Sequence, residues 1–222
     1  MSRKVLVVAP HPDDETLGCG GTLLRRKAEG AELAWLIVTE MNEQDGWPAA
    51  RIQHRDEEIA RVAALIGFDQ TFNLHLPAAK LDKLPMGELV AAFSSVFKSF
   101  EPEEVLVPHR GDVHSDHRIT FDAVAACAKW FRHPSVRRVL AYETVSETEF
   151  GLSGETTFQP NFFVDIGGYL ERKLEIMAVY QSELGSFPFP RSMEAIRALA
   201  TWRGATSGFL AAEAFQLLRE RQ

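Results

Sequence analysis

The chain has 222 residues, a formal net charge of −7 and a calculated pI of about 5.5. Its length suits one domain with a sizeable core, and its acidic balance argues against a nucleic-acid-binding protein, which needs a basic face for phosphate contacts. The two cysteines, Cys19 and Cys127, form no CxxC pair, and no apolar run approaches the roughly 20 residues of a membrane span, so we expect a cytoplasmic protein without a transmembrane segment or signal peptide.

The first predicted strand leads directly into a cluster of reactive side chains. Residues 5–9 are an uncharged, β-branched run that predicts a strand buried on both faces, and a helical pattern runs from Thr16 to about Glu29. Four reactive side chains lie between strand and helix: His11, Asp13, Asp14 and Glu15. Ligands bind at such strand ends in open α/β sheets, and imidazole with carboxylate is typical of a zinc site. The alternative is that the acids only favour the helix N-terminus.

The rest of the chain alternates between strand and helix patterns. Further strands are predicted over residues 33–38, 71–74, 104–107, 136–142 and 161–166, and helices over 51–66, 87–100, 119–130, 169–180 and 192–202. Residues 211–221 fit a helix or a strand. The alternation predicts an α/β fold with parallel strands in the order 3-2-1-4-5, because crossovers between parallel strands are right-handed. The glycines at 18, 20 and 21 predict a close approach of the first helix to a neighbour or a ligand.

A second cluster follows the fourth strand. The predicted loop over 108–118, PHRGDVHSDHR, contains three histidines and two aspartates, among them His114, Asp116 and His117. The predicted order makes the first and fourth strands neighbours, so this loop and the one with His11 face the same crevice. Together they predict a metal site, whereas the alternative is two unrelated clusters of structural hydrogen bonds.

The sequence HPDDE after a buried strand, with HSDH after a later one, resembles the PIG-L/LmbE family of zinc-dependent N-acetylglucosamine deacetylases. The resemblance extends to Arg55 and Glu58 before LIG, to Tyr142–Glu143, to KLEIMAVYQSE, and to WRGATSG followed by AEAF. It therefore covers nearly the whole chain. It implies a single LmbE-like domain over residues 1–222 with a three-layer α/β/α, Rossmann-like fold and a mostly parallel central sheet.

The resemblance also implies roles for individual residues. The metal ligands would be His11, Asp14 and His117, holding zinc, although iron(II) suits the same ligands. Asp13 would be the general base that takes a proton from the attacking water, and His114 would stabilise the oxyanion and help to protonate the leaving amine. Asp116 would hold a histidine in its working tautomer. The implied reaction is hydrolysis of an acetamide to acetate and a free amine.

Substrate contacts are less specific in the sequence. Glu43 lies in a polar loop after the second strand, where it either contacts substrate or is merely solvated. Arg55 either faces the ligand, as the resemblance implies, or forms a solvated ion pair with Glu58. Arg203 in WRG is a further candidate for substrate binding.

Several functions fit this site. The leading hypothesis is deacetylation of an N-acetylglucosamine-type amino sugar, free, as a sugar nucleotide or in a glycoconjugate precursor. The alternatives are a hydrolase of another bond, such as a phosphoester, and a non-catalytic sugar-binding protein. A phosphoesterase with two metals would need more bridging carboxylates than these loops supply. The sequence leaves a homo-oligomer open and does not name the sugar.

Overall fold

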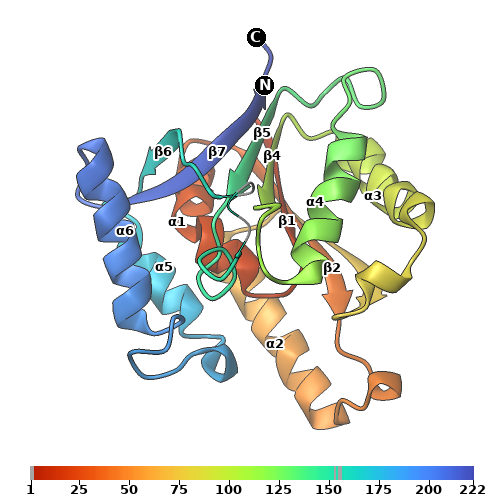
Figure 1. Ribbon diagram of the computed structural model, residues 1–222, viewed down its shortest axis with the longest axis horizontal. Helices are drawn as coiled ribbons and strands as arrows, with labels where there is room; N and C mark the ends of the chain where they lie inside the picture. Colours follow the sequence, from red (N-terminus) through yellow and green to blue (C-terminus); the bar gives the residue numbers. More distant parts are fainter. Residues whose placement is uncertain (1–2, 153, 155–156) are drawn as a thin grey trace.

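A seven-stranded sheet forms the middle layer of the computed structural model, which describes residues 3–152, 154 and 157–222 (Figure 1). Its strands are β1 Lys4–Ala9, β2 Glu32–Glu40, β3 Gln70–Pro77, β4 Glu104–Pro108, β5 Arg138–Tyr142, β6 Phe162–Asp165 and β7 Ala212–Glu220. The order is β3-β2-β1-β4-β5-β7-β6. The strands β1 to β5 pair in parallel, which confirms the predicted order, and β7 pairs antiparallel with β5 and β6.

Helices cover both faces of this sheet (Figure 1). They are α1 Asp14–Ala28, α2 Ala49–Ile66, α3 Met86–Phe100, α4 Ser115–Cys127, α5 Leu170–Met177 and α6 Met193–Ser207, with short 3-10 turns η1 Glu43–Asp45, η2 Leu81–Lys83 and η4 Gln181–Glu183. Alternate residues of β1 enter two separate cores. Val5 and Val7 pack with residues of α1, α2, α5 and α6, whereas Leu6 and Val8 pack with α3 and α4. The expected three-layer α/β/α architecture is confirmed.

The glycines of α1 allow two close contacts. A Cβ built on Gly18 would lie 2.2 Å from the ring of Tyr142, and one built on Gly21 would lie 2.8 Å from Ile166. The Tyr142 hydroxyl donates a hydrogen bond of 2.8 Å to the carbonyl oxygen of Val8 on β1. Between the two glycines the helix breaks at Cys19, where φ is −148°. The predicted close approach is therefore to neighbouring side chains, those of Tyr142 and Ile166.

One helix boundary differs from the prediction in a way that matters for the site. The helix α4 begins at Ser115 rather than at residue 119, so Asp116 and His117 lie in its first turn instead of in a loop. The cause is a cap that composition does not reveal, because His114 occupies the N-cap position and its Nδ1 accepts a hydrogen bond of 3.1 Å from the backbone of Asp116. The first helical turn therefore fixes the spacing of these three residues.

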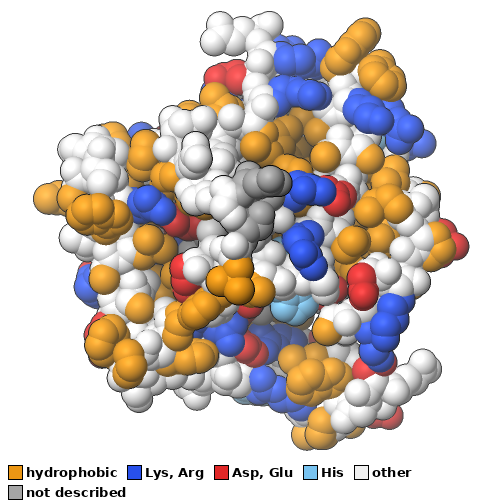
Figure 2. Space-filling view, in the orientation of Figure 1, with side chains coloured by type: hydrophobic (Ala, Val, Ile, Leu, Met, Phe, Trp, Pro, Cys, Tyr) orange, Lys and Arg blue, Asp and Glu red, His pale blue; other side chains and the backbone are white. Residues whose placement is uncertain are grey.

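Two further properties of the structure are the charge of its surface and the apolar character of its helices. Lys and Arg side chains are interspersed with acidic and apolar ones on the face shown in Figure 2. The expected absence of a nucleic-acid partner stays a prediction. Within the part of the chain that the structure describes, none of the helices combines the length and apolar character of a membrane span.

Candidate active site

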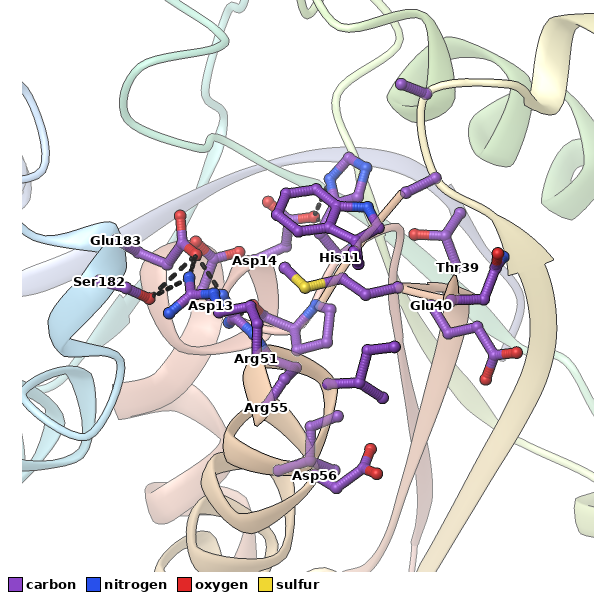
Figure 3. A pocket seen from close by; sticks show the side chains of 18 of the residues that line it. His11, Asp13, Asp14, Thr39, Glu40, Arg51, Arg55, Asp56, Ser182 and Glu183 are labelled. Carbon is purple, nitrogen blue, oxygen red and sulfur yellow. Dashed lines mark hydrogen bonds and ion pairs between the residues drawn. The ribbon is translucent and has the colours of Figure 1, made fainter. Parts of the chain in front are cut away.

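A cavity of about 840 Å³ opens at the carboxyl ends of the central strands, where the loops after β1 and β4 meet (Figure 3). One wall is the turn from His11 to Asp14, and the segment after β2, the helix α2 and the η4 turn supply others. His114 reaches the cavity from the loop after β4. The predicted convergence of the two His/Asp clusters is thus present in the fold.

At the inner end of this cavity, Asp14 lies between two histidines. Its Oδ2 is 3.4 Å from Nδ1 of His11 and 3.3 Å from Nε2 of His117. One ligand atom from each of the three residues falls within 4.8 Å of the others, so the group is able to hold a metal ion. Two imidazoles and one carboxylate are the donor set of many catalytic zinc sites, which leave a position for water. His11, Asp14 and His117 therefore fit the predicted metal.

The electrostatics of the cluster favour positive charge beside Asp14. Burial disfavours a charged imidazole, but hydrogen bonds to Asp116 and Asp14 outweigh burial and raise the pKa of His11 to about 9. Burial opposes charge on Asp14 as well, but His117 and His11 hold its pKa well below the usual range. A divalent cation held by these residues would supply this positive charge in place of the protons on the imidazoles.

Asp112 fixes one of these histidines, a role that the sequence pattern alone does not predict. Its Oδ2 lies 2.8 Å from Nδ1 of His117, and its Oδ1 accepts a hydrogen bond of 2.7 Å from Thr148. With a proton of His117 held at Nδ1 by this carboxylate, Nε2 is directed at Asp14. Carboxylates of this kind orient metal-binding histidines in many proteins. The available signal was the position of Asp112 in the same loop, five residues before His117.

Asp116 makes an equivalent contact with the other histidine. Its Oδ2 lies 3.1 Å from Nε2 of His11, and the same carboxylate accepts backbone hydrogen bonds from Ala79 at 2.7 Å and Leu81 at 3.2 Å. The residue is fully buried. Asp116 therefore lies where it would hold the His11 ring.

His114 lies beside the cluster as a neutral hydrogen-bond donor. Burial lowers its pKa to about 4, and the neighbouring His11 and His117 act in the same direction. Because its Nδ1 accepts the Asp116 backbone hydrogen bond, the proton of the neutral ring lies on Nε2. Its ring centroid is 4.6 Å from that of His11.

Asp13 is buried with a strained backbone. Its φ is 133°, a region that residues other than glycine rarely adopt, and its side chain lines the cavity. The backbone N–H of Asp13 donates to Oε2 of Glu15 at 3.0 Å, and Glu15 also accepts from Tyr180 at 3.0 Å. Burial, followed by the charge of Asp14, raises the pKa of Asp13. Strained backbone and a raised carboxyl pKa occur together at many catalytic sites.

The three predicted substrate contacts lie in different settings. Glu43 lines the cavity. Arg55 also borders it but is buried, donating to the Pro12 carbonyl oxygen at 3.0 Å and pairing with Glu183. Its ion pair with Glu58, at 3.3 Å, exists but is buried rather than solvated, which corrects that alternative.

Arg203 is not brought to the cavity. It is absent from the described residues that line the cavity, and its guanidinium forms two hydrogen bonds with Glu143, at 2.8 and 2.6 Å. A role for Arg203 in substrate binding stays a prediction.

Comparisons with known proteins agree with this geometry. The chain is 29% identical over 151 residues to an uncharacterized deacetylase, YaiS, of Escherichia coli (strain K12), a match that covers 65% of this chain and 75% of that one. It is 26% identical over 228 residues to a diacetylchitobiose deacetylase of Thermococcus kodakarensis, covering 97% and 83% of the two chains. Among solved structures, the conserved protein TT1542 from Thermus thermophilus superimposes with a TM-score of 0.78 at 29% identity, covering 98% of this chain and 96% of that one. The sequence model of the PIG-L family, described as GlcNAc-PI de-N-acetylase, matches residues 6–128, which include both His/Asp clusters. The chain therefore belongs to the PIG-L family.

Proposed function

We propose that this protein is a zinc-dependent hydrolase that removes the N-acetyl group from an N-acetylglucosamine-type amino sugar and releases acetate and a free amine. The observation that carries the proposal is the position of Asp14, 3.4 Å from His11 and 3.3 Å from His117. The names of the relatives, which include a diacetylchitobiose deacetylase, support the same reaction.

Each residue of the cluster has a part in this reaction. Held by His11, Asp14 and His117, zinc would polarise the acetamide carbonyl and lower the pKa of the attacking water. Asp13 takes a proton from that water, a task that its raised pKa supports. His114 donates its Nε2–H as a hydrogen bond to the oxygen on which negative charge develops, and the proton that Asp13 has taken from the water passes to the leaving nitrogen.

The residues around the cluster hold these groups in place. Asp112 orients His117, and Asp116 orients His11. In each histidine one ring nitrogen faces the orienting carboxylate, and the other nitrogen would be available to the metal. The bond from Arg55 to the Pro12 carbonyl fixes the turn that carries Asp13. In this proposal Arg55 acts on the loop, and the substrate meets Glu43 and the open cavity.

A screen of N-acetylated sugars tests the proposal. The protein is purified, loaded with zinc or with iron(II), and incubated with N-acetylglucosamine, its glycosides and its nucleotide esters. Free amine and acetate are measured, and metal per chain is counted in the same samples. Equal release of the two products with one metal per chain supports the proposal. Release of a nucleotide from the nucleotide esters would favour a hydrolase of phosphoester bonds, and tight binding of sugars without release of amine would favour a non-catalytic sugar-binding protein.

A further inference from the structure

Two apolar side chains that line the cavity belong to neither of the two hydrophobic cores. Trp47 is 40% exposed, and Ile52 is partly exposed in the first turns of α2. Both line the cavity, yet within the described residues neither packs into one of the two hydrophobic cores. Farther along α2, Ile59 and Ala63 do pack against a core. The apolar stripe of this helix therefore continues past the core and into the cavity.

The Trp47 indole is presented by an ordered turn. The Asn42 side chain accepts a hydrogen bond of 2.8 Å from the backbone of Asp45 and donates another of 2.8 Å to its carboxylate, and Lys80 pairs with the same carboxylate. Gly46 adopts a φ of 88°, and the N–H of Trp47 returns to the Asn42 carbonyl at 3.3 Å. The hydrogen bonds within this loop therefore fix the position of the Trp47 indole in the wall of the cavity.

The cavity is also long enough for more than one sugar ring. Ile52, Asp56 and Ile59 all line it, at positions i, i+4 and i+7 of one face of α2. The seven residue steps from Ile52 to Ile59 rise about 10 Å along the helix. Figure 3 shows Asp56 farther down α2 than Arg51 and Arg55, away from His11. A volume near 840 Å³ lies in the range of about 300–1,000 Å³ that accommodates drug-sized ligands.

Resting on the proposed function, we propose that Trp47 and Ile52 form a subsite for an uncharged, ring-bearing aglycone of the N-acetylated sugar. Flat apolar rings pack on an indole face, and Ile52 adds an aliphatic surface to the same cavity. The cavity is lined by groups of both charges. The three arginines among its described lining residues all pair with Glu183. In the described part of the chain, the carboxylates of Glu43 and Asp56 have neither an ion-pair nor a hydrogen-bond partner, so the unpaired charges are negative and disfavour an anionic aglycone.

The test compares ligands that differ only in the aglycone. Dissociation constants and kcat/KM are measured for methyl and phenyl N-acetylglucosaminides, as both anomers, and for N-acetylglucosamine 1-phosphate. Burial of about 60 Å² of ring surface changes an equilibrium constant about tenfold, so the phenyl glycoside is expected to bind about tenfold tighter than the methyl glycoside. The phosphate is expected to bind no tighter than the methyl glycoside.

Variants of Trp47 test whether the tighter binding of the phenyl glycoside comes from the subsite. Trp47→Ala is expected to remove the preference for the phenyl over the methyl glycoside, and Trp47→Phe is expected to keep most of it. Trp202→Ala is the matched control, because Trp202 is 62% exposed and is not among the described cavity residues. Equal binding of phenyl and methyl glycosides, or a preference that survives Trp47→Ala, overturns the inference. Tighter phenyl binding without any release of amine supports the subsite and contradicts only the proposed reaction.

Discussion

Replacement of Lys173 tests how the fold supports the catalytic turn. The helix α1 breaks at Cys19, which leaves backbone N–H and C=O groups near the break without helical hydrogen bonds. The ion pair of Lys173 on α5 and Glu213 on β7 forms hydrogen bonds with these groups. Glu213 accepts from the N–H groups of Gly21 at 2.9 Å and Thr22 at 2.6 Å. Lys173 donates to the Leu17 carbonyl at 2.8 Å and to Glu213 at 2.7 Å. Lys173→Met therefore leaves a buried carboxylate without its cation.

The expected cost follows from burial. Lys173 and Glu213 are each 4% exposed. Breaking such a buried pair from one side lowers the free energy of unfolding by about 3–5 kcal/mol. In a chain of this size the loss corresponds to a fall in Tm of about 6–20 °C. Adding Glu213→Gln removes the unpaired charge and is expected to restore part of the loss, because an amide oxygen still accepts one backbone hydrogen bond.

Circular dichroism during heating measures these differences. Lys27→Met is the matched control, since the Lys27–Asp69 pair at 2.7 Å has side chains 36% and 39% exposed and contributes under about 1 kcal/mol. A fall in Tm for Lys173→Met no larger than that of the control would refute the reasoning. So would a double variant that is no more stable than Lys173→Met alone.

Three further predictions concern single positions. Asp112→Asn is expected to weaken zinc binding about 10–100-fold in calorimetry, because the carboxylate that orients a ligand is lost, and unchanged affinity would contradict that role. Gly18→Ala is expected to destabilise the fold by about 1–3 kcal/mol, since the new Cβ would lie 2.2 Å from an aromatic ring, whereas Gly87→Ala, which meets nothing within 4 Å, is expected to be neutral or stabilising in denaturant titrations. Burial raises the pKa of Cys127 to about 11 and that of Cys19 well above its usual value, so both thiols stay protonated at pH 8. Both are expected to react with a thiol reagent only after the protein unfolds. Rapid reaction of the native protein would show that one of them is accessible.

The sequence predicts the centre of the fold better than its edge. The apolar runs of β1 and β4 are uninterrupted because each is buried on both faces, and their order follows from the handedness of crossovers. The sequence of the last strand, β7, fits a helix as well as a strand, because its outer half is exposed and its pairing partners, β5 and β6, lie far away in the chain. Local pattern carries no information about such a partner.

The site divides in the same way. HPDDE and HSDH indicate their chemistry by residue type, and the strand order brings them together. The partner of each histidine could not be predicted, because it depends on loop geometry: Asp112 reaches His117 only through the path of the loop after β4. Trp47 lies in the same predicted loop as Glu43, where a residue either contacts substrate or is solvated, and the sequence does not decide between the two because an exposed loop tryptophan and one that lines a cavity have the same pattern.

Metal content measured together with turnover, in two variants of the same turn, separates metal binding from catalysis. Asp13→Asn keeps the shape of the side chain and removes its basicity, so we expect a rate loss of about 10²–10⁴-fold with zinc still bound. His11→Ala removes a ligand and is predicted to lose the metal together with the activity. Near wild-type turnover by zinc-loaded Asp13→Asn, or full zinc content in His11→Ala, would contradict the roles proposed for these residues.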